Sequence, residues 1–204
     1  MIHIVDYGLG NIQAFIHTYK RLDLDVMVAR NETDLAGATK IILPGVGSFD
    51  HAMELLNASG MRSALERLVR EQRIPVLGVC VGMQILASGS DEGKLPGLGW
   101  VPGQVRALAS FADWGGLPVP HMGWNDVRGR DVHGLFKNLE VECRFYFLHS
   151  YVLECVEPTH VAATTTYGVE FCCAVKHDNV YGVQFHPEKS HESGMRLLQN
   201  FAEL

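Results

Sequence analysis

The amino-acid sequence predicts an α/β fold: an open, largely parallel central sheet with flanking helices and added antiparallel strands. In the first half of the chain, short apolar runs alternate with helical patterns, which is the order of parallel strands joined by single helices. In the second half, short β-rich runs follow one another without long helices between them, which indicates hairpins. No linker or repeat interrupts the 204 residues, so we expect residues 1–204 to form a single domain.

The first half opens with a short apolar run, Ile2–Val5, that is typical of a buried strand. A Gly/Asn turn at residues 7–11 then leads into an amphipathic helical pattern. The same alternation continues along the chain. We expect strands at Ile2–Val5, Val26–Ala29, 40–43 and 75–79, and helices at 12–22, 50–58, 61–71 and 81–87.

In the second half, β-branched and aromatic residues gather in five short runs, at residues 100–108, 145–149, 160–166, 171–175 and 180–185. Hairpins among these runs would either add antiparallel strands to the central sheet or form a small second sheet. A last amphipathic pattern predicts a closing helix at residues 193–202.

Composition narrows the function classes. The net charge is −6, from 17 basic and 23 acidic residues, and no basic stripe is present, so we expect no nucleic-acid partner. No apolar run approaches the roughly 18 residues of a membrane helix, so we expect no membrane span. The first residues have neither a basic segment nor a small-residue cleavage site, so we expect a cytoplasmic protein.

The five cysteines are odd in number, two are adjacent, and none forms a C-x-x-C pair. This pattern favours neither a disulfide framework nor a zinc site, so we expect no metal and no cofactor. Each cysteine is therefore judged by its own surroundings.

Cys80 lies in the run Gly78-Val79-Cys80-Val81-Gly82, between a predicted strand and a predicted helix. This is the layout of a nucleophile elbow with Cys in place of Ser. A sharp turn there would lift the sulfur above the sheet edge and place it at a helix N-terminus, where partial positive charge favours a thiolate. The alternative is a buried structural cysteine, the common fate of this residue type.

A nucleophile of this kind needs a base within hydrogen-bond reach and a third group that orients the base. His186 and Glu188 stand two residues apart after the last predicted strand, with a proline between them that stiffens the link. They are the candidate base and orienting residue. Alone, an H-x-E triplet is more typical of a surface loop.

The third predicted strand ends in a glycine-containing loop whose backbone N–H groups could converge on a developing oxyanion. A second donor would be the N–H of the residue after the nucleophile. The alternative is a plain strand-end turn. The candidate oxyanion residues are Gly45, Val46, Gly47 and Val81.

These segments together resemble the class I (triad) glutamine amidotransferases: Pro44-Gly45-Val46-Gly47, then Gly78–Gly82 continuing as Met83-Gln84, then Phe185-His186-Pro187-Glu188. Three further runs, at residues 120–125, 146–151 and 182–190, are similar to the glutaminase subunits of imidazole glycerol phosphate synthases, which serve histidine biosynthesis. The resemblance spans nearly the whole chain.

The resemblance implies that glutamine and water give glutamate and ammonia through a Cys80 thioester, with His186 as acid and base and Glu188 as its orienting residue. It also implies a heterodimer, in which ammonia passes through a sealed route to a barrel-shaped synthase (cyclase) subunit. The residues it places around glutamine are Gln84, Glu92, Ser150 and Tyr151. Those it places near the partner interface and ammonia route are Trp124, Asn125, Tyr146 and Lys189.

Three other interpretations remain at the level of sequence. A second-copy family member could supply ammonia to a sugar amidotransferase in surface polysaccharide (O-antigen) biosynthesis, with the same glutaminase motifs. A non-catalytic regulatory module could share the fold, although the intact triad motif disfavours it. A cysteine hydrolase or peptidase would share the elbow but not the run at residues 122–125.

Overall fold

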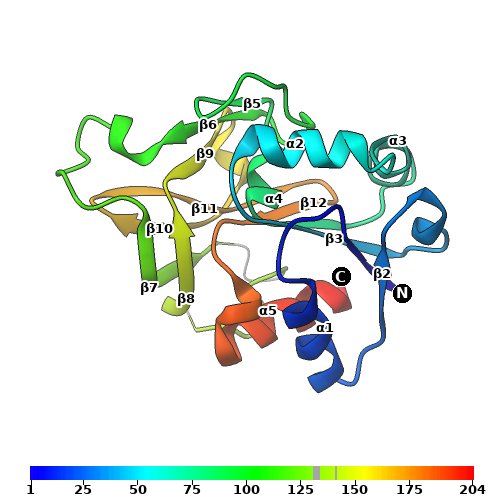
Figure 1. Cartoon of the computed structure of the whole chain (residues 1–204). Coiled ribbons are helices and arrows are strands. Elements are labelled where there is room, and N and C mark those ends of the chain that lie inside the picture. The colour runs from blue at the N-terminus through cyan, green and yellow to red at the C-terminus, as the bar shows by residue number, and fades with distance from the viewer. Residues whose placement is uncertain (131–133, 141) are drawn as a thin grey trace.

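A computed structural model describes residues 1–130, 134–140 and 142–204. Within these residues the chain builds one nine-stranded sheet and one three-stranded sheet (Figure 1). The large sheet runs in the order β2 (Val26–Ala29), β1 (Ile2–Val5), β3 (Lys40–Gly45), β4 (Val76–Cys80), β12 (Val180–Val183), β11 (Val169–His177), β10 (Val161–Tyr167), β7 (His121–Gly129) and β8 (Glu142–His149).

The large sheet has two halves of different direction. The strands from β2 to β12 pair in parallel, as the alternating first half of the sequence predicts. From β12 to β8 every pairing is antiparallel. The small sheet contains β5 (Gly89–Ser90), β6 (Gly103–Ala107) and β9 (Tyr151–Cys155). The second-half strands therefore do both things that the sequence left open: they extend the main sheet and build a second one.

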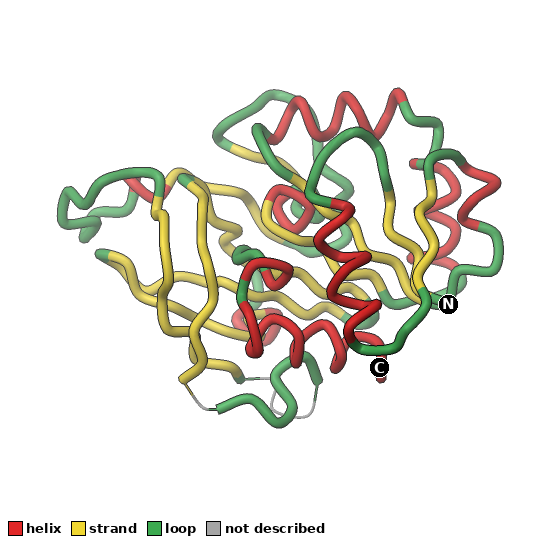
Figure 2. The backbone as a smooth tube through the Cα atoms, turned by 60° about the horizontal axis from the view of Figure 1, so that its bottom comes forward, coloured by secondary structure: helices red, strands yellow, loops and turns green. Residues whose placement is uncertain are grey.

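Helices cover both faces of the parallel half (Figures 1 and 2). One face carries α1 (Ile12–Arg21) and α5 (His191–Glu203), joined where the Tyr19 hydroxyl donates to the Leu198 carbonyl at 3.2 Å. The opposite face carries α2 (Phe49–Ala58), α3 (Arg62–Glu66) and α4 (Val81–Gln84). No helix among the described residues is long and apolar enough to cross a membrane.

Two predicted helices differ from the structure. The segment predicted as one helix at 61–71 is α3 followed by a π-helical turn, Arg67–Glu71. The helix predicted at 81–87 ends at Gln84, because the carbonyls of Ile85 and Leu86 accept hydrogen bonds from Leu98 and Trp100 rather than from a continuing helix. Strands β5, β7 and β9 were not predicted. Four single-turn 3₁₀ helices complete the described elements: Glu32–Leu35, Leu108–Ser110, Pro158–His160 and Pro187–Lys189.

The parallel strands are buried on both faces. Every residue of β1, β4 and β12 is buried, which is the pattern of a sheet covered by helices on both sides. Side chains along these strands therefore serve packing. What the sheet offers to a ligand is the edge where the strands end, which is where ligands bind in open α/β sheets.

The first turn of α4 packs unusually close to the ends of β3 and β4. A Cβ added at Gly82 would overlap the Leu43 carbonyl oxygen, and one added at Gly78 would lie 2.5 Å from the Gly82 carbonyl oxygen. Only glycine allows backbone segments to approach this closely. The two flanking glycines of the Cys80 motif are thus required by the packing of strand ends against α4.

We expect Gly82→Ala to lower the free energy of unfolding by about 3 kcal/mol, because the new methyl group meets backbone that cannot rotate away. The matched control is Gly37→Ala. Gly37 has a φ of +76° but open space around it, so this change should cost only about 1 kcal/mol from backbone strain. Urea unfolding followed by circular dichroism measures both. Equal losses in the two variants would contradict the close-packing argument.

Candidate active site

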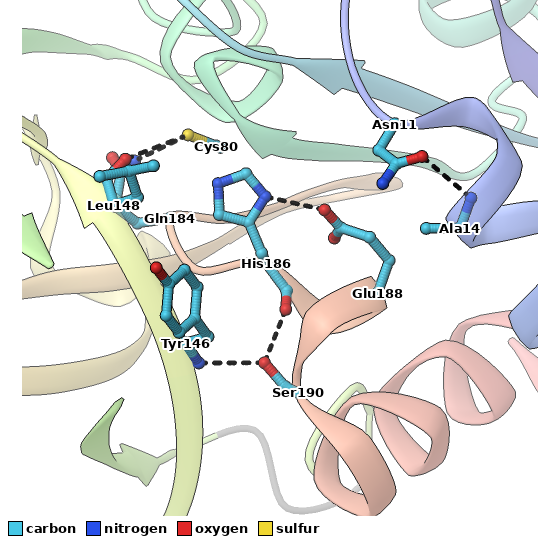
Figure 3. Close-up of polar contacts among 9 residues, drawn as sticks. All are labelled: Asn11, Ala14, Cys80, Tyr146, Leu148, Gln184, His186, Glu188 and Ser190. Atoms are coloured by element: carbon cyan, nitrogen blue, oxygen red, sulfur yellow. Dashed lines mark hydrogen bonds and ion pairs between the residues drawn. The ribbon is translucent and has the colours of Figure 1, made fainter. Parts of the chain in front are cut away.

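Cys80 stands at the junction between β4 and α4. Its backbone has φ +56° and ψ −115°, a conformation rare for any residue other than glycine. Its side chain is nearly buried, with 4% of the residue exposed. The Sγ atom lies 3.9 Å from the Leu148 carbonyl oxygen and 3.9 Å from the Gln184 side-chain nitrogen (Figure 3). The structure thus has the sharp strand-to-helix turn at Cys80 that the sequence predicts.

His186 and Glu188 come just after β12, and β12 is the strand that pairs with β4. His186 Nδ1 lies 2.8 Å from Glu188 Oε1, and both side chains are almost fully buried (Figure 3). The main chain of His186 is also held: its N–H donates to the Tyr146 carbonyl at 2.9 Å, and its carbonyl accepts from the Ser190 hydroxyl at 2.6 Å. The imidazole therefore has a fixed position, with one nitrogen toward Glu188 and the ring beside Cys80.

The electrostatics of His186 follow from these neighbours. Burial lowers the pKa of the ring, but hydrogen bonds with Cys80 and Glu188, and the negative charge of both partners, raise the pKa of His186 to about 9 overall. A ring with this pKa holds a proton at neutral pH. It is therefore suited to donate that proton to a leaving group beside Cys80.

The end of β3 faces the start of α4, so the glycine loop lies next to the nucleophile. Gly45 pairs in register with Cys80 across the two strands. Gly47 has a φ of +94°, and the Pro44 carbonyl just before the loop accepts a 2.7 Å hydrogen bond from the buried Tyr7 hydroxyl. Tyr7 was not predicted from sequence, and it fixes one end of this loop.

Beside Cys80 is a pocket of about 230 Å³. It brings together most of the residues that the sequence selected, from five separate parts of the chain. Its lining is Val46, Gly47, Cys80, Val81, Gln84, Glu92, Pro120, Leu148, His149, Ser150, Tyr151 and His186. Gly45 and Glu188 are outside this lining, and Glu188 sits behind His186 as an orienting residue should. Within the described residues, no group of three or more His, Cys, Asp or Glu side chains could hold a metal ion.

Hydrogen bonds hold the polar wall of the pocket. The Gln84 side-chain nitrogen donates to the Tyr151 carbonyl and to the Gln184 side-chain oxygen, both at 3.1 Å. Glu92 Oε2 accepts from the Phe49 N–H at 2.9 Å, at the start of α2. Gln184, fully buried and two residues before His186, was not selected from sequence. The two-residue period of an extended chain could have indicated it, because residues 184 and 186 share a face.

Beside the pocket lies an exposed apolar surface on the outward side of the β7–β8 hairpin. We call it the outer apolar face, and it consists of Met122, Trp124, Tyr146 and Leu148. Trp124 stacks on His191 with ring centroids 5.2 Å apart, and it meets the Tyr146 ring edge-on at 6.1 Å. Lys189 Nζ lies 5.8 Å from the centre of the Tyr146 ring. Three of the four predicted interface residues therefore cluster here.

Asn125 is placed differently. Side chains alternate along β7, so Asn125 lies on the inward side of the hairpin, opposite to Trp124. Its side-chain nitrogen lies 2.9 Å from the Thr166 carbonyl oxygen and 3.2 Å from His121 Nε2. The structure does not bring Asn125 onto the outer apolar face.

Comparisons with known proteins agree with this geometry. Residues 3–204 match the family model "Glutamine amidotransferase class-I". The chain is 63% identical to the imidazole glycerol phosphate synthase subunit HisH of Bdellovibrio bacteriovorus over 204 residues, covering 100% of both chains. It is 52% identical to the protein of the same name from Leptospira interrogans, again over 100% of both.

Solved structures show the same fold. A crystal structure of a glutamine amidotransferase superposes with a TM-score of 0.78 at 20% identity, covering 99% of this chain and 97% of that one. A chain in the structure of PurLQS from Thermotoga maritima gives a TM-score of 0.74 at 18% identity, covering 99% of this chain and 97% of that one. The chain belongs to the class I glutamine amidotransferases, and within them to the family of imidazole glycerol phosphate synthase HisH subunits.

Proposed function

We propose that this chain is the glutaminase subunit of an imidazole glycerol phosphate synthase, which hydrolyses glutamine and passes the ammonia to a synthase subunit in histidine biosynthesis. The observation that carries the proposal is the pocket whose wall holds both Cys80 and a His186 ring fixed by Glu188 at 2.8 Å. The names of the relatives support this pathway and give no support to the polysaccharide alternative.

The chemistry takes two steps. Cys80 Sγ, whose proton already lies on the His186 ring, attacks the side-chain carboxamide carbon of glutamine. The C–N bond then breaks as His186 gives this proton to the nitrogen, which leaves as ammonia. Water next attacks the thioester carbon as His186 accepts its proton. The C–S bond breaks with its electron pair on sulfur, His186 keeps the proton it took from water, and glutamate is released.

The other pocket residues have roles that follow from their chemistry. Backbone N–H groups of the glycine loop and of Val81 surround the carbonyl oxygen as it gains charge. The Glu92 carboxylate suits the ammonium group of glutamine, whereas the hydroxyl groups of Ser150 and Tyr151 suit its carboxylate. The residues assigned to the oxyanion are Gly45, Val46, Gly47 and Val81, and those assigned to substrate binding are Gln84, Glu92, Ser150 and Tyr151.

The partner would dock on the outer apolar face. Trp124 and Leu148 are 41% and 38% exposed, and exposed aromatic residues are typical anchors of protein interfaces. Because Leu148 also lines the pocket, docking there would close the site against water. A sealed route is needed because ammonia in neutral water is mostly protonated and then has no lone pair for attack. We propose that the partner is a barrel-type synthase subunit. We also propose that residues 1–204 form a single glutaminase domain and that the protein is cytoplasmic.

Removal of the nucleophile should abolish glutamine hydrolysis. We expect Cys80→Ala to lower glutamate release by several orders of magnitude, since members of a triad act as a unit. An electrophilic glutamine analogue should modify Cys80 alone, as read by mass spectrometry of peptides. Cys155→Ala is the control, because Cys155 is partly exposed but outside the pocket lining, and it should be labelled and active like the native chain. Labelling of another cysteine with Cys80 untouched would overturn the assignment.

Loss of Glu188 should cost less than loss of His186. If Glu188 only orients the base, Glu188→Ala should be roughly 10- to 100-fold faster than His186→Ala, as with third members of other triads. Steady-state glutamate release under one set of conditions gives the order. Glu192→Ala, an exposed carboxylate four residues further on, should behave as wild type. A Glu188 variant slower than the His186 variant would reverse the roles.

Partner binding should switch the enzyme on. One peptide of the glycine loop can point its N–H toward or away from the oxyanion, because glycine makes both states accessible. Losing one such donor typically costs about 100- to 1,000-fold in rate. We therefore expect slow glutamate release from the isolated chain and a rise of at least about 100-fold when the synthase partner and its acceptor substrate are bound.

The same assay tests the docking surface. Trp124→Ala should raise the partner concentration for half-maximal stimulation by about tenfold or more, because interface anchors typically contribute about 2 kcal/mol or more and about 1.4 kcal/mol is a factor of ten. Leu204→Ala, at the C-terminal end of the chain and outside the outer apolar face, is the exposed apolar control. Full activity of the isolated chain would refute the switch while leaving the Cys80 mechanism intact.

A further inference from the structure

Two buried histidines, one in the pocket wall and one behind it, take no part in the chemistry above. His121 on β7 pairs directly with His149 on β8, and the two residues are only 3% and 6% exposed. His149 lines the pocket between Leu148 and Ser150, whereas His121 lies one layer behind. The His121 ring is sandwiched between Phe147 and Tyr167, with centroids 4.7 and 4.2 Å away.

The hydrogen bonds of this pair leave only one arrangement of protons. His149 Nδ1 lies 3.0 Å from the Tyr151 carbonyl oxygen, which can only accept, so Nδ1 carries a hydrogen. Burial, with the neighbouring His121 ring second, lowers the pKa of His149 to about 3, so the ring is neutral and its Nε2 is a bare acceptor. That Nε2 lies 2.9 Å from His121 Nδ1, which must therefore donate.

The same reasoning extends one step outward. Burial lowers the pKa of His121 to about 4, so this ring is neutral as well, and its Nε2 is free to accept from the Asn125 side-chain nitrogen at 3.2 Å. The second hydrogen of that nitrogen goes to the Thr166 carbonyl at 2.9 Å. Asn125 Oδ1 accepts from the Asp126 N–H at 2.9 Å, which fixes the orientation of the amide. Every donor and acceptor along this path then has one consistent direction.

This chain of hydrogen bonds ends at the Tyr151 carbonyl, in the polar wall of the pocket. The Tyr151 carbonyl that accepts from His149 also accepts from Gln84 at 3.1 Å, and Gln84 in turn donates to Gln184. Tyr151 begins β9, so this carbonyl stands where the chain leaves the large sheet for the small one. No side chain other than those of His149 and Gln84 is bonded to it among the described contacts. The histidine pair thus holds the turn that presents Ser150 and Tyr151 to the pocket.

We propose that His121 and His149 form a neutral pair of positioning residues, which holds the glutamine pocket through the Tyr151 carbonyl and the Gln84 side chain. The inference rests on the proposed glutaminase function only for its kinetic readout. The essential role of His121 is to donate one hydrogen bond to His149, which keeps His149 in the tautomer that Tyr151 requires. Because Tyr151 and Gln84 bind substrate before and during the reaction, the loss should act mainly on KM.

Two substitutions of His121 distinguish the hydrogen bond that it donates to His149 from the packing of its ring. His121→Phe keeps a ring between Phe147 and Tyr167 but removes the donor to His149. His121→Gln can donate to His149 and accept from Asn125, because an amide carries both groups. We expect His121→Phe to raise KM for glutamine about tenfold or more, with kcat changed less than about threefold, which is the effect of one buried hydrogen bond. His121→Gln should stay within about threefold of wild type in both constants.

Tyr167→Phe is the matched control. It keeps the ring that stacks on His121 and removes only the hydroxyl that donates to the Pro118 carbonyl, outside the path. It should leave kcat and KM unchanged. A His121→Phe variant that folds, as judged by its thermal unfolding, and keeps both constants within about twofold of wild type would overturn the proposal.

Nuclear magnetic resonance gives a readout that does not depend on activity, with His121→Gln used only to assign the His121 signals. With ¹⁵N-labelled histidine at about pH 7, both rings should show Nδ1 protonated and Nε2 bare, and the His121 signals should be absent from His121→Gln. A charged ring, or the opposite tautomer at either position, would refute the proposal. If the wild type failed to hydrolyse glutamine, the proposed function would fall, and this spectrum would still decide on the histidine pair.

Discussion

Cys80 has a φ of +56°, and such a conformation costs a residue with a Cβ on the order of 1–3 kcal/mol. It persists because the surrounding backbone leaves no alternative. The first turn of α4 lies so close to the ends of β3 and β4 that neither Gly78 nor Gly82 could carry a side chain. This contact sets the sulfur above the sheet edge. It also sets the distance to the neighbouring strand end, where His186 follows β12, and to the glycine loop that follows β3.

The pocket contains two histidines whose charges differ because their neighbours differ. His186 and His149 both line it, and burial lowers the pKa of each. His186 faces the Glu188 carboxylate and Cys80, which raise its pKa to about 9. For His149, burial and then the neighbouring His121 ring lower the pKa; the Tyr151 carbonyl raises it, His186 lowers it again, and the result is a pKa of about 3. At neutral pH the His186 ring therefore carries a proton that it can transfer, whereas the His149 ring stays neutral and does not take that proton up. This separation is what the proposed roles require, with His186 as acid and base and His149 as a positioning residue.

A feature of the fold or the site could be predicted from the sequence when the residues that form it are close together along the chain. Cys80, His186 and Glu188 were predicted because each stands in a short motif at a strand end, and the parallel half of the sheet followed from alternation of strands and helices. The histidine pair was not predicted, because His121 and His149 meet only through the pairing of β7 with β8. The run at β7 contains Gly, Asn and Asp, which are poor strand formers, so its strand was missed. Without that strand, the inward direction of Asn125 could not be inferred either.

The β7–β8 hairpin gives the outer apolar face and the histidine pair a common support. Successive side chains of a strand point to opposite sides, so Met122 and Trp124 face outward while His121 and Asn125 face inward on the same strand. On β8, Leu148 is exposed and also lines the pocket, and His149 is its direct neighbour in sequence. Trp124 therefore shares its strand with His121 and Asn125, which belong to the hydrogen-bonded path that leads to the Tyr151 carbonyl. We expect a partner that docks on the outer apolar face to act on the pocket through this strand pair, because a shift of its backbone would move the side chains on both sides together. The strength of that coupling would depend on the stiffness of the inward hydrogen bonds, which run from Thr166 through Asn125, His121 and His149 to the Tyr151 carbonyl at 2.9 to 3.2 Å.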